Sequence, residues 1–167
     1  MRLAGTRRAA ASQPVAWLAA ALLAGSVAVA VKAAPSSFGP VIGNAVLCRS
    51  HLDNAFFYSY LTAAFGPSYK REGGAFWFKA DATLWGTPIS DIIVSDDSGA
   101  ITFLGAVAEA TPDQLDESIR AAVGARHTKA GNAPFALRES GPGSKIVYFN
   151  TRSKIYCAKF KPLPPGP

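Results

Sequence analysis

The stretch "FWFKADATLW", residues 76–85, decides the fold that we expect for this chain. Apolar residues alternate along it with a second set of side chains, which are Trp77, Lys79, Asp81, Thr83 and Trp85. A period of two is typical of a β-strand whose two faces differ. We therefore expect Phe76, Phe78 and Leu84 to face a core, and the second set to point to the other side of a sheet.

This second set is the candidate binding surface that the sequence offers. Its two indoles, with polar side chains between them, suit contact with a peptide or a sugar, and tryptophan is enriched at binding hot spots. We expect at least one of Trp77 and Trp85 to be accessible to solvent. The alternative is that the second helix or the chain termini cover one or both of them.

More strands are predicted along the rest of the chain. Residues 89–95 follow a Gly-Thr-Pro break, and residues 100–109 follow a short sequence that is typical of a hairpin turn. Near the C-terminus, residues 134–140 and the two halves of 145–160 predict three others. The last two surround a turn at Asn150–Ser153. Because sequential strands with short turns pair antiparallel, these segments predict an antiparallel sheet.

An aromatic helix is predicted within "CRSHLDNAFFYSYLTAAFG", residues 48–66. Ser50 is expected to cap its start, and Gly66-Pro67 to end it. Its apolar residues spread over more than one side, which is typical of a buried helix; the alternative is a face kept for a partner or a second copy. Tyr58 and Tyr60 carry hydroxyl groups, so we expect them at the rim as further candidates for binding.

A second, amphipathic helix is predicted to begin after Thr111 and to end at Gly124. The order of elements is then one helix, three strands, one helix and three strands. This order predicts a single α+β domain with an antiparallel sheet of five or six strands and two helices, packed mainly on one face of the sheet.

The N-terminal residues 1–33 have the features of a secretory signal peptide. Arginines precede an apolar run at 14–31, and small residues follow that run. Cleavage is expected near Val31 or Ala34. The alternative is an uncleaved membrane anchor, because the run is close to the shortest length that spans a bilayer. The remaining segments are expected to be a Pro/Gly/Ser-rich tether at 34–47, one domain at 48–161 and a Pro-rich tail at 162–167.

The chain has two cysteines, Cys48 and Cys157. An even pair in an exported protein predicts one disulfide, which would join the start of the domain to its last strand. The alternative is two buried free thiols. A four-residue loop at Asn150–Ser153 would place Ile146 opposite Cys157, on an apolar face. Two cysteines without a nearby pair of histidines are too few ligands for a metal, so we expect no metal site.

The charge of the chain excludes one class of partner. The whole sequence has 17 basic and 11 acidic residues, a net charge of +6. Residues 1–33 hold four of the basic residues and no acidic ones, so removing them leaves 13 against 11, a net charge of +2. This balance, without a basic stripe or a recognisable module, predicts no binding to nucleic acid.

Catalytic motifs are sparse in the sequence. His51 and His127 are the two histidines, and the chain contains no serine-hydrolase elbow, zinc-protease motif or phosphate-binding glycine loop. Asp91, Asp96 and Asp97 lack the spacing of a calcium loop, and a hairpin turn explains the last two. No cofactor is predicted.

The sequence therefore favours an exported, periplasmic or secreted, non-enzymatic module that binds a protein, a peptide or a glycan. Two alternatives remain open. One is a small extracytoplasmic hydrolase whose site assembles from residues that are far apart in sequence. The other is a membrane-anchored envelope protein that uses an uncleaved N-terminal helix.

Overall fold

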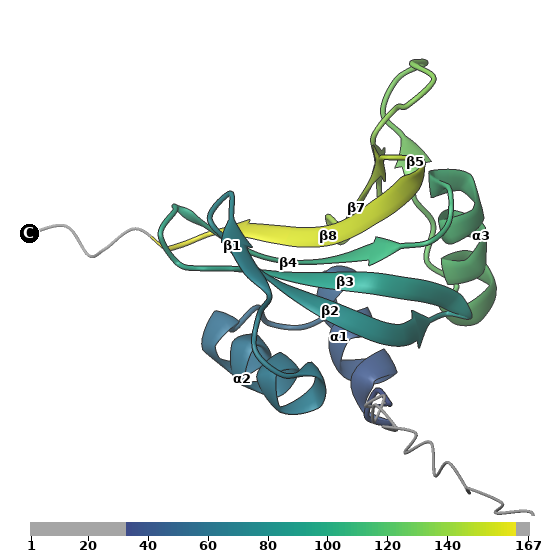
Figure 1. Ribbon diagram of the computed structural model, residues 1–167. Coiled ribbons are helices and arrows are strands. Elements are labelled where there is room, and N and C mark those ends of the chain that lie inside the picture. The colour runs from purple at the N-terminus through teal and green to yellow at the C-terminus, as the bar shows by residue number, and fades with distance from the viewer. Residues whose placement is uncertain (1–32, 163–167) are drawn as a thin grey trace, which may run out of the picture. The chain divides into compact units, whose positions relative to one another are not determined.

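The computed structural model describes residues 33–162. The predicted signal peptide or anchor, apart from its last residue, and the tail after residue 162 lie outside the described residues. The described part has three helices and one antiparallel sheet of eight strands, in the order β1-β2-β3-β4-β8-β7-β6-β5 (Figure 1). The helices are α1 (Phe38–Val46), α2 (Asn54–Phe65) and α3 (Pro112–Val123). The strands are β1 (Lys70–Glu72), β2 (Ala75–Leu84), β3 (Thr87–Ser95), β4 (Ile101–Ala108), β5 (Thr128–Lys129), β6 (Arg138–Glu139), β7 (Lys145–Phe149) and β8 (Arg152–Phe160).

The α+β class, the antiparallel sheet and the disulfide are confirmed, while the predicted numbers of strands and helices are too low. The added strands are short. β1 is a three-residue charged segment and β5 has two residues, so neither is long enough to show the period of a strand.

Helix α1 lies in the segment that the sequence predicts to be a tether, so the prediction is wrong for residues 38–46. Phe38, Ile42 and Val46 are fully buried and recur every four residues, which places them on one side of a helix. Pro40 is in the first turn, where a missing backbone N–H is tolerated. The proline and glycine content therefore concealed a short apolar helix.

Helix α2 begins three residues later than expected. Its N-cap is Asp53, not Ser50, and the Asp53 carboxylate accepts a hydrogen bond of 3.0 Å from the backbone N–H of Phe56. Gly66 ends the helix at a positive φ of 92°, as predicted. Phe57 and Leu61 are buried against the sheet, whereas Phe56 is exposed. The helix is therefore buried on one side only.

Helix α3 confirms the predicted capping pattern. Thr111 and Gln114 form a reciprocal capping box, and Gly124 ends the helix in the left-handed conformation. Leu115 and Ile119 are fully buried and join the same core as α1 and α2. Figure 1 shows α1 and α2 packed beneath the long strands, with α3 at the end where β8 begins.

The two faces of the sheet have separate apolar clusters. All three helices contribute to the larger cluster, which includes Phe78, Ile92, Leu104 and Ile155 from the strands. We call this side the covered face. The smaller cluster consists of buried Ala75, Ile93 and Val107 with partly buried Trp77, Phe103 and Phe149. We call this side the open face, because it contains no helical residue of the described part of the chain.

The predicted disulfide joins Cys48, just after α1, to Cys157 on β8, with 5.2 Å between the two Cα atoms. Cys157 is fully buried on the covered face. Such bonds are typical of proteins in oxidising compartments outside the cytoplasm. Within residues 33–162, every helix is too short or too polar to cross a bilayer.

Tight turns fix the register of the sheet. Trp85-Gly86 and Asn150-Thr151 each have positive φ at both residues, as in the two-residue turns that suit twisted hairpins. The loop between β7 and β8 therefore has two residues, not the four considered above, and Ile146 pairs with Ile155. Ile146 still lies with Cys157 in the core, because the side chains at 155 and 157 share one face.

Candidate functional site

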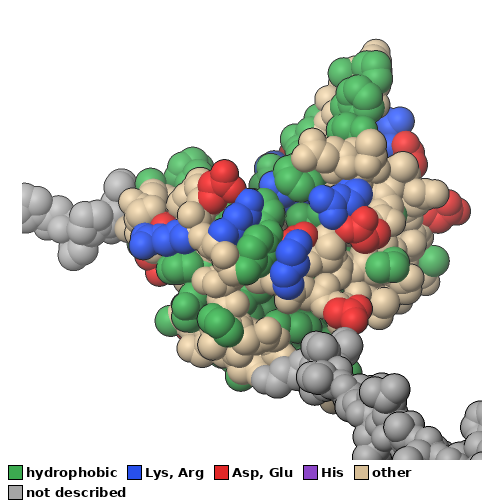
Figure 2. Space-filling view, in the orientation of Figure 1, with side chains coloured by type: hydrophobic (Ala, Val, Ile, Leu, Met, Phe, Trp, Pro, Cys, Tyr) green, Lys and Arg blue, Asp and Glu red, His purple; other side chains and the backbone are tan. Residues whose placement is uncertain are grey.

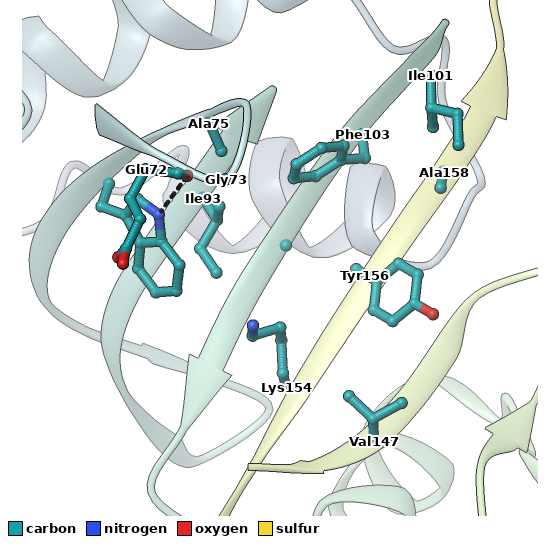
Figure 3. A pocket seen from close by; sticks show the side chains of 12 residues that line it. Glu72, Gly73, Ala75, Ile93, Ile101, Phe103, Val147, Lys154, Tyr156 and Ala158 are labelled. Atoms are coloured by element: carbon teal, nitrogen blue, oxygen red, sulfur yellow. Dashed lines mark hydrogen bonds between the residues drawn. The ribbon is translucent and has the colours of Figure 1, made fainter. Parts of the chain in front are cut away.

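The open face contains a groove of about 660 Å³ (Figure 3). This volume lies within the range of roughly 300–1,000 Å³ that is common for small-molecule sites. Its apolar lining comes from five strands of the sheet. The main apolar side chains are Trp77, Ile93, Phe103, Val147, Tyr156 and Ala158.

The alternation of strand residues explains why these side chains meet. Phe103 lies next to fully buried Leu104 on β4, and Tyr156 lies next to fully buried Cys157 on β8, so each strand sends one set to the helices and the other to the groove. Gly105 adds depth because it places no side chain in the floor. A Cβ there would lie 3.3 Å from the Cβ of Tyr156.

Trp77 forms one wall of the groove. Its Nε1–H donates a hydrogen bond of 3.3 Å to the backbone carbonyl of Glu72, which holds the indole against the β1–β2 hairpin. The ammonium groups of Lys70 and Lys154 lie 4.3 Å and 5.2 Å from the indole centroid, within cation–π range. The aromatic wall of the groove therefore carries positive charge on its surface.

Lys154 points into this apolar space from β8, and Glu72 is the other charged residue of the lining (Figure 3). Its Nζ also lies 4.2 Å from the ring centroid of Phe149. Within residues 33–162, no carboxylate lies within the 4.0 Å of an ion pair with Lys154. Burial, and then the charge of Lys70, lower the pKa of Lys154 below its ordinary value.

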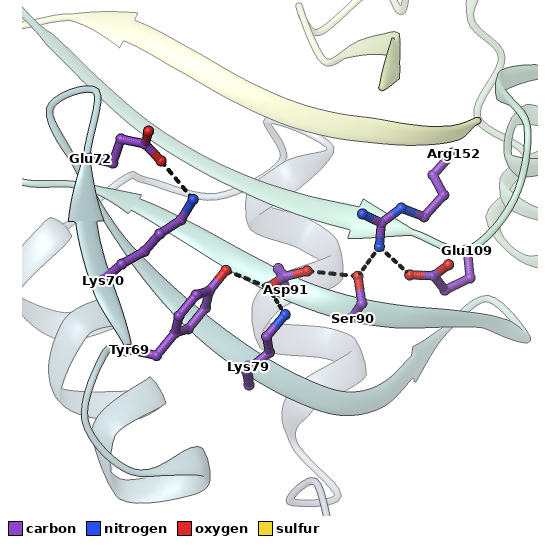
Figure 4. A network of polar contacts seen from close by, with 8 residues as sticks. All are labelled: Tyr69, Lys70, Glu72, Lys79, Ser90, Asp91, Glu109 and Arg152. Carbon is purple, nitrogen blue, oxygen red and sulfur yellow. Dashed lines mark hydrogen bonds and ion pairs between the residues drawn. The ribbon is translucent and has the colours of Figure 1, made fainter. Parts of the chain in front are cut away.

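A polar network lies on the same face (Figure 4). The buried Asp91 carboxylate accepts hydrogen bonds from the Tyr69 hydroxyl at 2.9 Å, the Lys79 ammonium at 2.8 Å and the Ser90 hydroxyl at 2.8 Å. Arg152 donates to the Ser90 hydroxyl at 3.1 Å and pairs with Glu109 at 2.6 Å. These contacts link β2, β3 and β8.

The charges of this network are balanced internally. Burial alone would raise the pKa of Asp91, but the hydrogen bonds from Lys79, Ser90 and Tyr69 together hold it below its ordinary value. Burial and the Asp91 carboxylate raise the pKa of Tyr69. The Arg152 guanidinium lowers the pKa of Glu109. Each charge of the network already has a partner, so the network stabilises the sheet. Within residues 33–162, Lys154 is left in the groove without an ion-pair partner.

The structure divides the residues that the sequence singled out. Trp77 lines the groove, and Lys79 belongs to the neighbouring network. Asp81 and Thr83 are exposed on β2 beyond the groove. Trp85 lies outside the strand, in the turn, and packs on the covered face. Its indole lies 3.5 Å from the point that a Cβ added to Gly43 would occupy. The expectation that both tryptophans share one face is therefore wrong.

The two tyrosines also lie apart from the groove. Tyr58 packs edge-on against Phe76 and Phe78, and Tyr60 shares a hydrogen bond of 3.1 Å with Ser37. Both side chains are partly buried and pack against the core of the covered face. Phe103, Lys154 and Tyr156 were not among the residues predicted from the sequence. The alternation of side chains in strands β4 and β8 was the signal available for them.

A second cluster has the composition of a hydrolase triad. His127 Nδ1 lies 3.0 Å from Asp116 Oδ1, and its Nε2 lies 3.2 Å from Ser144 Oγ. The backbone N–H of His127 also donates to Asp116, and Ser140 Oγ accepts from the backbone N–H of Ser144. Burial lowers the pKa of His127 below its ordinary value, although hydrogen bonding to Asp116 opposes that shift.

This cluster is closed to a substrate. Ser144 is 0% exposed and His127 is 4% exposed, so neither the hydroxyl nor the imidazole presents a free approach. Its contacts join α3 to the segment that precedes β5 and to the turn before β7, which is a structural role. Within residues 33–162, no group of three His, Cys, Asp or Glu side chains is arranged to hold a metal ion.

Comparison of the chain with protein-family models, with curated proteins and with solved structures finds no match.

Proposed function

We propose that the protein is an exported, non-enzymatic binding module whose ligand occupies the groove of the open face. The observation that carries this proposal is the apolar lining of the groove, in which Trp77 and Phe103 remain only partly buried. Apolar side chains gathered in a hollow and left in contact with water are typical of binding sites. In the view of Figure 2, hydrophobic side chains (green) lie between Lys and Arg side chains (blue) on the surface of the described part.

The lining favours an apolar ligand over a glycan. A sugar needs many hydrogen-bonding groups, whereas Ile93, Val147 and Ala158 offer none from their side chains. Of the partners expected from the sequence, a peptide or protein with apolar side chains stays compatible with the groove. The disulfide and the predicted signal peptide support export to the periplasm or to the exterior.

The experiment is a titration with Nile red, a neutral apolar dye whose emission rises in apolar surroundings. We expect saturable binding to one site of the wild-type protein. Ala158→Phe fills the groove and should weaken binding at least about tenfold, which corresponds to ~1.4 kcal/mol. Thr83→Phe adds the same side chain at an exposed strand position outside the groove and should leave dye binding unchanged. Equal binding to both variants, or no binding to the wild type, would contradict the proposal.

The hydrolase alternative has one observation in its favour, the Asp116–His127–Ser144 geometry. A fluorophosphonate, which labels activated serines, tests it directly. Because Ser144 is fully buried, we expect the reagent not to label it. Mass spectrometry of the treated protein measures whether a label is present. Labelling that Ser144→Ala abolishes would support the hydrolase instead.

A further inference from the structure

Among the described residues 33–162, Lys154 has no counter-ion, and it lies in an apolar groove. Its neighbours around the ammonium are the rings of Trp77 and Phe149, which attract a cation but do not neutralise it. A partly buried charge is expensive unless it is paired. The ligand is therefore expected to supply the missing negative charge.

The surroundings of Lys154 add to this positive charge. Lys70 lies over the same indole and is the charge that acts on Lys154. The Lys70 ammonium is paired with the Glu72 carboxylate at 2.6 Å, so Lys70 already has a counter-ion. Glu72 lines the groove yet lies beyond ion-pair distance of Lys154. The charge that remains to be complemented is thus at Lys154.

We infer that the groove binds a small amphipathic anion, a molecule with an apolar alkyl or aryl body and one anionic head group such as a carboxylate. The apolar body lies against Trp77, Phe103 and Tyr156, and the head group pairs with the Lys154 ammonium. This inference rests on the proposed function and names the class of its ligand. It follows from charge complementarity, since an apolar floor and a single unpaired cation match an apolar body and a single anion.

Anion binding is favourable because it stabilises the protonated, charged form of Lys154. Burial and Lys70 disfavour the ammonium in the empty groove. A bound carboxylate offsets both effects, because an opposite charge within a few ångströms favours the charged form. Anion binding is therefore linked to protonation of Lys154, and affinity for the anion falls as the pH rises through the pKa of this residue.

The test compares three ligands with ten-carbon chains and different head groups: decanoate and decyltrimethylammonium, each below its critical micelle concentration, and decanol, below its solubility limit. Isothermal titration calorimetry of the full chain at neutral pH measures their affinities. We expect decanoate to bind at least tenfold more tightly than decanol, and the cation to bind most weakly. The preference for decanoate should shrink as salt is added, because salt screens the ion pair.

Two substitutions on β8 make the test specific. Lys154→Met removes the charge and keeps an unbranched side chain, so decanoate and decanol should then bind with equal affinity. Lys159→Met removes a lysine of the same strand that is exposed and lies outside the groove lining, so the preference should persist. Circular dichroism establishes that both variants are folded.

The possible outcomes separate this inference from the proposed function. Equal binding of decanoate and decanol to the wild type, or a preference that survives Lys154→Met, would overturn the inference and leave an apolar binding groove in place. Binding of Nile red without binding of decanoate, decanol or decyltrimethylammonium would also overturn the inference and keep the apolar binding groove. Failure of the dye and of all three ligands would overturn both.

Discussion

The same strands form the covered and the open face of the sheet, but the apolar side chains of the two faces differ in how far they are buried. On the covered face, three helices bury Leu104, Ile155 and Cys157 completely, and a disulfide fixes that layer. On the open face, Phe103 and Tyr156, each next to one of those residues in sequence, remain partly accessible around a cation. The difference indicates that the covered face stabilises the fold, while the open face keeps apolar surface for a ligand.

Removing the disulfide should produce one of the two largest losses of stability, because it acts on the covered face. The bond closes a loop with a sequence separation of 109 residues. For a Cys48→Ser/Cys157→Ser variant we expect the free energy of unfolding to fall by ~2–5 kcal/mol, measured by urea denaturation under oxidising conditions. An unchanged midpoint would show that the bond contributes nothing to the covered layer.

Neighbouring substitutions on β4 compare the two faces directly. Leu104→Ala opens a cavity in the helix-packed core and should cost ~2–5 kcal/mol. Phe103→Ala removes a larger side chain that is partly exposed, and should cost only ~1 kcal/mol while abolishing Nile red binding. If Phe103→Ala were the more destabilising of the two, the open face would be part of the stabilising core.

The buried His127, which is hydrogen-bonded to Asp116 of α3, predicts that the stability of the protein depends on pH. Because burial lowers its pKa in the folded protein below the ordinary 6.5, the unfolded chain binds more protons as the pH falls below that value. Stability should therefore decline with acidification below pH ~6.5, by at most ~1.4 kcal/mol per pH unit from this residue. Denaturation between pH 7 and 5 measures the slope.

His127→Gln should remove this slope, whereas His51→Gln, at an exposed position, should retain it. A slope that persists in His127→Gln would assign the pH dependence to other groups.

Lys154→Met should have the smallest effect on stability, and in the opposite direction. Because the folded protein holds this cation partly buried beside Lys70, replacing it with an apolar side chain should raise the free energy of unfolding by a few tenths of a kcal/mol. Lys159→Met is the matched control and should leave it unchanged. A destabilised Lys154→Met protein would mean that the lysine is needed for the fold.

Sequence patterns predicted the class of the fold and part of the site. The alternation in residues 76–84 identified a two-faced strand and placed Trp77 on the face away from the helices, and the cysteine pair predicted the disulfide. Trp85 was misplaced because β2 ends at Leu84 and a two-residue turn reverses the chain there. Helix α1 was missed because proline and glycine lie among its apolar residues.

The groove itself could not be predicted from the sequence. It depends on the order β2-β3-β4-β8-β7, which brings Trp77 and Lys154 together although 77 positions separate them. Local patterns give the face of each residue within its own strand, but not which strands are neighbours. The unpaired state of Lys154 likewise follows only from the positions of the surrounding carboxylates.

The most direct test of the central claim is a map of ligand contacts by two-dimensional NMR on isotope-labelled protein titrated with decanoate. We expect the amide signals of Phe103, Lys154 and Tyr156 to shift with increasing ligand, and those of Leu61 and Ile119, in the core of the covered face, to stay in place. Shifts confined to the helices and the covered core, with the open face unaffected, would contradict it.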